Sequence, residues 1–497
     1  MAALPIAAMM LLALMLLGVG AADRLQPPGW VLTPHAAALV AKNSSLLGTC
    51  LPCCDEPPPG QPCCCPGGCP GGCPGCPPLP PSCPPPKNHS GGDLPLPALQ
   101  PVAASSLLTG DGVVFVGRVQ HAAGGATMFD MNGVQIKAAV TGTASLFASM
   151  SQVQKVQGNV FQVYLDGVLQ PSSRFNTSSW VAGQVVKVPL FPSGSLDAAA
   201  THAVTIFKDT EPGGRMNQSS GVMASNYITF HGFSGDSTAR LLPPPALRAS
   251  ATPPAAPHRV EFLGDSITAG FDNQCDIAGA PEGMPWSESF AKSWATLLCN
   301  ELGAECHYNA WSGLGMVVNC CSGCGGWPKC NAVDTFGSDI WTRTLATVGS
   351  LNTSDPHGTT PANEWDFRKW TPDAVVINLG TNDHLGANSS STAKSQAFVK
   401  RYEELVVAAA KAYGKGTRFF LACGPMASDY CDEVKAVIAS VTATGTGIKA
   451  YLLNQVEFED GKNSTYGKVC AYGHPGSQID AAIAKNGSAF ISATMGW

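Results

Sequence analysis

Apolar runs of strand length alternate with helical stretches from residue 258 to the end of the chain. Four such runs are "HRVEFLGDS", "PDAVVINLGTND", "TRFFLACGPM" and "IKAYLLNQV". One stretch between them ends at Gly414 and has apolar residues at helical spacing, namely Phe398, Tyr402, Leu405, Val406 and Ala409. The stretch "WSESFAKSWATLLCNELG" is expected to be helical as well. The alternation predicts an α/β region with a parallel sheet that helices cover on both faces.

A different pattern fills residues 110–235, where short strand-like segments alternate apolar and polar residues. "NVFQVYLDGVLQ" places Phe161, Val163 and Leu165 on one face and then turns at Asp166 and Gly167, a hairpin signal. Further short strands with Gly, Asn and Ser between them predict an all-β sandwich. The segment "LLPPPALRASATPPAAP" is rich in Pro and Ala and predicts a linker. We therefore expect a sandwich at 100–240, a linker at 241–257 and an α/β domain at 258–497.

The first residues, "MAALPIAAMMLLALMLLGVGAADR", combine an apolar run with small residues at a cleavage-like position. They predict a signal peptide over residues 1–22, with a retained signal anchor as the alternative. The chain also has 20 cysteines and eight Asn-x-Ser/Thr sequons, at Asn43, Asn88, Asn176, Asn217, Asn352, Asn388, Asn463 and Asn486. These features favour a secreted, extracellular glycoprotein that is not held in the membrane after cleavage. A location in the cell wall agrees with the same features.

Ten of the cysteines fall between Cys50 and Cys83, inside a Cys/Pro-rich segment that spans residues 23–99. This segment has few residues that form a core, so it predicts either an extended spacer or a small disulfide knot. Its Cys-x2-Cys pairs also fit a metal site, but secretion favours disulfides. A wall or matrix anchor is a third interpretation. The net charge of −6 and the charged fraction of 13% argue against a nucleic-acid partner, and the sequence does not determine the oligomeric state.

Chemically versatile residues follow several of the predicted parallel strands, where ligands of such sheets bind. Ser266 lies between a strand and a helix-like run, so it fits either a helix N-cap or a nucleophile. His474, in "CAYGHPGSQ", is the candidate base. The backbone N–H groups of Ser266 and Gly313 and the amide of Asn382 are candidate donors to an oxyanion. The Gly-x-Ser-x-Gly elbow of α/β-hydrolases is not present around Ser266.

The blocks "GDS", Gly313, "GTND" and "HPG" stand in the order found in SGNH (GDSL-type) hydrolases, which this sequence resembles. The segments "VEFLGDSITAGF", "WSGLGM", "WDFRKWTPDAVVINLGTND", "GPM" and "GHPG" resemble carbohydrate esterase family 2, the acetyl-xylan-esterase-like group. The resemblance implies a flavodoxin-like SGNH hydrolase domain preceded by a jelly-roll sandwich. It also implies Ser266 as nucleophile, His474 as general base, Gly313 and Asn382 in the oxyanion hole, and catalysis without a metal or cofactor.

The sequence departs from the SGNH pattern at Ala471, where an aspartate usually precedes the catalytic histidine by three residues. Some members of the family are similar in using a Ser-His dyad, in which a backbone carbonyl orients the imidazole. A carbonyl suffices for this because the Nδ1 proton needs an acceptor that is not necessarily charged. The loss of the carboxylate weakens stabilisation of the imidazolium, so an inactive relative is the alternative.

Other residues near these blocks have structural interpretations. Asp265 and Asp383 are expected to accept hydrogen bonds from turn N–H groups. His384 is expected in a surface loop, with a place at the border of the cleft as the alternative. Cys320, Cys321, Cys324 and Cys330 favour disulfides over a zinc site. Trp286, Trp311 and Trp327 are interpreted as packing residues, with a sugar-stacking platform as the alternative.

Together these features predict a secreted serine esterase that removes O-acetyl groups from an acetylated polysaccharide of the xylan or glucomannan type. An esterase for lipids or small esters, and an inactive glycan-binding wall protein, are the alternatives.

Overall fold

The computed structural model describes residues 107–122, 124–153, 158–212, 227–243, 257–279, 286–319, 335–336, 340–348, 363–384, 392–443 and 447–497. The predicted signal peptide (1–22), the Cys/Pro-rich segment (23–99) and most of the predicted linker lie outside these residues. The cysteines between 320 and 330 and Trp327 lie outside them too, so the predictions made for these parts stay predictions.

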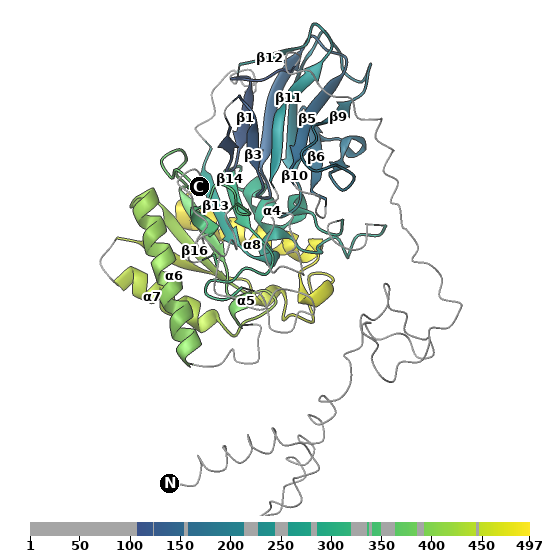
Figure 1. Ribbon diagram of the computed structural model, residues 1–497. Helices are drawn as coiled ribbons and strands as arrows, with labels where there is room; N and C mark the ends of the chain where they lie inside the picture. Colours follow the sequence, from purple (N-terminus) through teal and green to yellow (C-terminus); the bar gives the residue numbers. More distant parts are fainter. Residues whose placement is uncertain are drawn as a thin grey trace, which may run out of the picture. The chain divides into compact units, whose positions relative to one another are not determined.

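Two antiparallel sheets form the first part of the described chain (Figure 1). The first has the order β1-β4-β10-β6-β7, with β12 paired to β4 and β8 to β6. Its strands are β1 (Val113–Val116), β4 (Gln135–Thr141), β6 (Val160–Leu165), β7 (Val168–Leu169), β8 (Phe175–Asn176), β10 (Thr201–Lys208) and β12 (Arg240–Leu242). The second, ordered β2-β3-β11-β5-β9, comprises β2 (Gln120–His121), β3 (Thr127–Phe129), β5 (Leu146–Gln152), β9 (Val186–Phe191) and β11 (Ile228–Gly235).

Successive side chains of each strand point to opposite faces of its sheet, which explains how the two sheets enclose a core between them. Phe161 and Val163 on β6, and Val204 and Ile206 on β10, are fully buried in one cluster with residues of the second sheet. The predicted hairpin forms between β6 and β7, and Asp166 adopts a positive φ of 51° at its turn. The sandwich predicted from the alternation is therefore confirmed.

A parallel five-stranded sheet with the order β14-β13-β15-β16-β17 forms the second part. Its strands are β13 (Arg259–Gly264), β14 (Glu305–Ala310), β15 (Ala374–Asn378), β16 (Arg418–Cys423) and β17 (Lys449–Asn454). β13, β15, β16 and β17 match the four apolar runs. β14 carries Cys306, His307 and Asn309 among its apolar residues, and the sequence pattern did not single it out.

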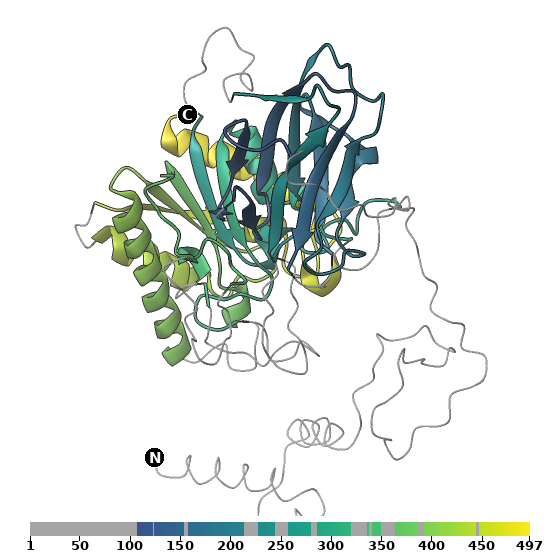
Figure 2. The same cartoon turned by 45° about the horizontal axis from the view of Figure 1, so that its top comes forward.

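Helices cover both faces of this sheet, as predicted for a parallel sheet (Figures 1 and 2). Helices α6 and α7 pack with Val375 and Ile377 of β15, whereas α4 and α8 pack on the other face with Ala374 and Val376. The helices are α3 (Ser266–Ala269), α4 (Trp294–Glu301), α5 (Thr381–His384), α6 (Thr392–Tyr413), α7 (Cys431–Ala443) and α8 (Ser477–Met495). Short 3-10 turns are η3 (Pro171–Ser173), η5 (Phe290–Lys292), η6 (Ile340–Thr342), η8 (Val456–Phe458) and η9 (Ala471–Gly473).

The helix expected over the whole stretch "WSESFAKSWATLLCNELG" is shorter than predicted, because α4 begins only at Trp294. Ser293 caps it by accepting a hydrogen bond from the N–H of Thr296. The preceding residues bind the sandwich instead: the N–H of Phe290 donates to the carbonyl of Asp209, and the N–H of Ala291 donates to its carboxylate. These contacts with distant residues take the backbone donors away from a longer helix.

Candidate active site

Strand β13 ends at Gly264 and leads directly into α3, which begins at Ser266. The cap of this short helix is Asp265, whose Oδ1 accepts a hydrogen bond of 3.0 Å from the N–H of Ile267. Ser266 is therefore the first helical residue, and the N-cap interpretation of Ser266 is wrong. Because Asp265 caps the helix, the hydroxyl of Ser266 is left for another partner.

That partner is His474, whose Nε2 lies 2.8 Å from Oγ of Ser266. Nδ1 of the same ring lies 2.8 Å from the carbonyl oxygen of Ala471. A carbonyl only accepts, so in the neutral ring Nδ1 carries the proton, and Nε2 accepts from the Ser266 hydroxyl. Each of the two side chains is 7% exposed. The position at which SGNH enzymes usually carry an aspartate thus supplies a backbone carbonyl to the histidine.

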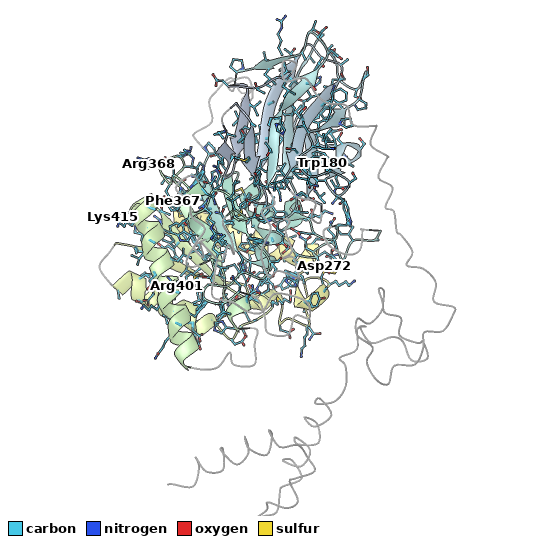
Figure 3. All side chains as sticks on the ribbon, in the orientation of Figure 1. Trp180, Asp272, Phe367, Arg368, Arg401 and Lys415 are labelled. Carbon is cyan, nitrogen blue, oxygen red and sulfur yellow. A yellow bond between two sulfur atoms is a disulfide. The ribbon has the colours of Figure 1, made fainter. Side chains whose placement is uncertain are left out.

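The turn that carries His474 is tied to the segment that follows α3. A disulfide joins Cys470 to Cys275 across 195 positions of sequence. The N–H of Ala471 donates to Oδ2 of Asp272 over 3.2 Å; Asp272 is labelled in Figure 3. These links hold the histidine and the serine together although 208 positions separate them in the sequence.

Gly313 lies in the loop that follows β14, with a φ of 80° that L side chains rarely adopt. Gly315, two residues on, leaves no room for a side chain, because an added Cβ would lie 2.0 Å from the carbonyl oxygen of Val318. In the described part of the chain, the N–H of Gly313 has no hydrogen-bond acceptor. Ser266, as the first residue of α3, likewise has no acceptor for its N–H within the helix.

Asn382 lies in α5, at the end of β15. Its Nδ2 donates to the carbonyl of Leu314 over 2.9 Å and lies 3.3 Å from Oδ2 of Asp265. The second contact is the longer and weaker of the two. Asn382 therefore reaches the same loop as Gly313.

Asp265 is buried and Asp383 is half-buried, and both accept hydrogen bonds from turn N–H groups, as predicted. Asp383 accepts from the N–H groups of Met316, Val317 and Val318. Burial raises the pKa of Asp383 despite these bonds. Burial, with the charge of nearby Asp383 adding to it, raises the pKa of Asp265 to about 7.

The surface-loop prediction for His384 is wrong. Its side chain is buried at the end of α5, Nδ1 bonds to the carbonyl of Gly380 over 2.9 Å, and the ring stacks on Tyr430. Its ring also contacts Phe398 of α6, a contact that the local sequence does not reveal.

Trp311 is buried at 4% exposure, as a packing residue would be, and Trp286 is partly exposed. The sequence analysis overlooked Tyr472, which is 82% exposed and only two residues from His474. Tyr472 adopts a positive φ of 59°, unusual for an aromatic residue. Its ring lies 6.4 Å from Phe271, which in turn lies 4.7 Å from His474. The one available signal was its place beside the histidine.

The six cysteines in the described ranges form three disulfides, Cys275–Cys470, Cys299–Cys306 and Cys423–Cys431. Within those ranges, no group of three or more His, Cys, Asp or Glu side chains is placed to hold a metal ion. None of the helices described in the structure has the length and apolarity needed to span a bilayer.

Residues 262–463 match the model of the GDSL-like Lipase/Acylhydrolase family. This part of the chain is therefore similar to the GDSL-like lipases and acylhydrolases. The curated relative "Cellulase/esterase CelE" of Acetivibrio thermocellus is 29% identical over 252 residues, which are 50% of this chain and 27% of the relative. The chain thus spans about a quarter of that relative's length.

The combination of a sandwich and an α/β region occurs in solved structures as well. A family two carbohydrate esterase from Clostridium thermocellum, in complex with cellohexaose, matches with a TM-score of 0.57 and 25% identity, over 78% of this chain and all of the other. A family 2 enzyme with a carbohydrate binding domain from Corynascus thermopiles matches with a TM-score of 0.56 at 24% identity, over 78% of this chain and 100% of that chain. These matches confirm the predicted fold class, a β-sandwich followed by an α/β SGNH domain, and the resemblance to carbohydrate esterase family 2.

Proposed function

We propose that this chain is a secreted esterase that removes O-acetyl groups from polysaccharide through an acetyl-enzyme at Ser266. The observation that carries the proposal is the hydrogen-bonded series from Ser266 Oγ to His474 Nε2, and from His474 Nδ1 to the Ala471 carbonyl. Within the described residues, the backbone N–H groups of Ser266 and Gly313 have no acceptor, and both residues follow strands of the parallel sheet at their carboxyl ends. The similarity to family two carbohydrate esterases supports the same chemistry.

In the first half of the proposed reaction, Oγ of Ser266 attacks the acetyl carbonyl while Nε2 of His474 takes the hydroxyl proton. The negative charge that develops on the carbonyl oxygen is stabilised by the N–H groups of Ser266 and Gly313 and by the Asn382 amide. The tetrahedral intermediate collapses, His474 gives the proton to the departing sugar oxygen, and the acetyl group stays on Ser266.

In the second half, a water molecule attacks the acetyl-enzyme and His474 takes its proton. Collapse of the second tetrahedral intermediate breaks the Ser266 ester, returns the proton to Oγ and releases acetate. The Ala471 carbonyl keeps the imidazole in the tautomer that this cycle needs, because it accepts only from a protonated Nδ1.

The experiment that tests this proposal compares the wild type with Ser266→Ala. Acetate release is measured from acetylated xylan, from acetylated glucomannan and from chromogenic esters with acyl chains of increasing length. We expect the wild type to be much faster on acetyl esters than the variant. Equal rates for the two proteins on every substrate would contradict an enzymatic role, and rates that rise with acyl length would favour a lipid substrate.

Secretion is part of the proposal and rests on the predicted signal peptide and on the three disulfides. The sequon asparagines Asn463 and Asn486 are exposed, so glycans can be attached to them without unfolding the domain. Treatment of the protein secreted by a eukaryotic host with an N-glycosidase should lower its apparent mass.

The pH dependence of the reaction should follow His474. Burial lowers the pKa of His474 below the usual 6.5, against the raising effects of the Ala471 carbonyl and of the Asp272 charge. Only the neutral imidazole accepts the serine proton, so activity falls as the pH drops through this pKa. We expect the acid limb of kcat/KM against pH to have its midpoint below 6.5. Asp272→Asn should lower that midpoint further, whereas a rise would contradict the assignment.

We expect Tyr472 to contact the sugar that carries the acetyl group, because it is an exposed aromatic residue two positions from His474. We expect Tyr472→Ala to raise KM for acetylated polysaccharide about 3- to 10-fold, as one aromatic contact is worth about 0.5–1.5 kcal/mol. The kinetics of a short-chain acetyl ester should stay unchanged. Equal effects on both substrates would contradict a contact with the sugar.

A further inference from the structure

Hydrogen bonding around the Gly313 loop distinguishes that glycine from its neighbours. Between Trp311 and Val318, every backbone N–H except that of Gly313 has an acceptor in the described part of the chain. On the C-terminal side of Gly313, the carboxylate of Asp383 binds three of these N–H groups. On the N-terminal side, Oε2 of Glu211 accepts from the N–H of Ser312 over 2.6 Å. Two carboxylates therefore hold the loop, one on each side of the free donor.

Glu211 does not belong to the hydrolase region, because it follows β10 of the β-sandwich by three residues. Both polar groups of the Glu211 backbone form hydrogen bonds. Its N–H donates to Oε1 of the buried Glu288 over 2.6 Å, and its carbonyl accepts from Nζ of the buried Lys208 over 2.8 Å. The carboxylate that bonds to Ser312 thus belongs to a residue whose own N–H and carbonyl are both hydrogen-bonded.

We propose that Glu211 is a positioning residue of the esterase site, through which the β-sandwich holds the Gly313 N–H in place for the oxyanion. This rests on the proposed function of the site. Ser312 and Gly313 are joined by one peptide unit, so the bond from the Ser312 N–H to Glu211 restricts the direction of the next N–H. The sandwich is then a part of the catalytic unit as well as a neighbouring domain.

The expected effect of a displaced Gly313 N–H on kcat and KM depends on the stage of the reaction at which the oxyanion exists. The negative oxygen is present in the tetrahedral transition states and absent from the bound ester, so a displaced Gly313 N–H affects kcat and leaves KM almost unchanged. Loss of one whole oxyanion donor costs roughly 10²–10³-fold in kcat. Loss of the residue that positions such a donor should cost less, about 10- to 100-fold.

The experiment uses three substitutions at Glu211 in the full chain, assayed on a short-chain acetyl ester. Glu211→Ala removes the acceptor and should lower kcat about 10- to 100-fold with KM within about twofold of the wild type. Glu211→Asp keeps the charge but is one methylene shorter, so it should lower kcat as well. Glu211→Gln keeps an oxygen at the same reach and should restore kcat to within about threefold of the wild type.

A matched control is available at the same interface. Asp130 of the sandwich also accepts backbone N–H bonds from the hydrolase region, from Ala346 and Thr347, but contacts none of the proposed catalytic residues. Asp130→Asn should leave kcat unchanged. The proposal is overturned if Glu211→Ala and Glu211→Asp both keep the wild-type kcat, if Glu211→Gln fails to restore it, or if Asp130→Asn lowers it equally.

Hydrogen–deuterium exchange provides a second measurement that does not depend on activity. Peptides that contain Ser312 to Leu314 should exchange faster in Glu211→Ala than in the wild type or in Asp130→Asn. Unchanged exchange there would overturn the positioning role. If the wild type were as inactive as Ser266→Ala on every ester, the proposed function would be contradicted. The exchange measurement would still decide whether Glu211 holds the loop.

Discussion

Replacing His474 by alanine is expected to lower kcat for acetyl ester hydrolysis by roughly 10⁴–10⁶-fold, the largest effect of any substitution proposed for activity. The reason is that Nε2 of His474 is the acceptor within hydrogen-bond reach of the Ser266 hydroxyl. Ser266→Ala should cost about as much, and the double variant should be no worse than either single one, because the two residues act as a unit. Steady-state kinetics on a chromogenic acetyl ester, with thermal melts to confirm folding, measure this.

The same experiment separates a Ser-His dyad from a triad with an unrecognised acid. Asp272 is the carboxylate whose charge acts on His474, yet it bonds to the N–H of Ala471 and not to the imidazole. We expect Asp272→Asn to lower kcat by less than about tenfold, since the Ala471 carbonyl still orients the ring. Asparagine also tolerates the positive φ of 54° at this position. A carboxylate whose removal is as severe as His474→Ala would contradict the dyad.

Arg118→Met is expected to lower the free energy of unfolding by about 3–5 kcal/mol, because it leaves a buried carboxylate without its charged partner. Arg118 is a fully buried residue of the sandwich, and its guanidinium lies 2.8 Å from Oε1 of Glu261 on β13. It also donates to the carbonyls of Trp341 and Arg343, and lies over the rings of Trp365 and Phe367. Denaturant unfolding followed by tryptophan fluorescence measures the change.

Two controls make this prediction specific. Arg118→Met combined with Glu261→Met removes both charges and should destabilise less than Arg118→Met alone, because no unpaired buried charge remains. Arg368, labelled in Figure 3, is an arginine paired with Asp366 at the surface, and its side chain is 89% exposed. Arg368→Ala should leave stability unchanged within error. A double variant less stable than Arg118→Met would contradict the explanation.

Local patterns in the sequence were sufficient for most of the fold. The β6–β7 hairpin and four of the five parallel strands were predicted because periodic burial leaves a periodic trace in the sequence. β14 was not singled out, since polar residues interrupt its apolar run. The predicted start of α4 was wrong, because Asp209 accepts hydrogen bonds from the N–H groups of Phe290 and Ala291 although it is far away in the sequence.

The candidate site was likewise predicted only in part from the sequence. The motifs around Ser266, Asn382 and His474 singled these residues out because each follows a recognisable strand or precedes a helix, whereas Gly313 was singled out by the resemblance to SGNH hydrolases. Their mutual geometry was not visible. That Asp265 caps α3 in place of Ser266, and that His384 lies buried against Tyr430, depends on side-chain directions that no local pattern encodes.

The sequence by itself determined that the chain has a β-sandwich and a parallel α/β region, and that a serine and a histidine lie at the edges of that sheet. Only the tertiary structure decided how His474 is held without an aspartate and that Glu211 of the sandwich bonds to the loop beside Gly313. The physical reason is that hydrophobic periodicity is a property of neighbouring residues. The hydrogen bonds that orient a reactive group join residues brought together only when the whole chain packs.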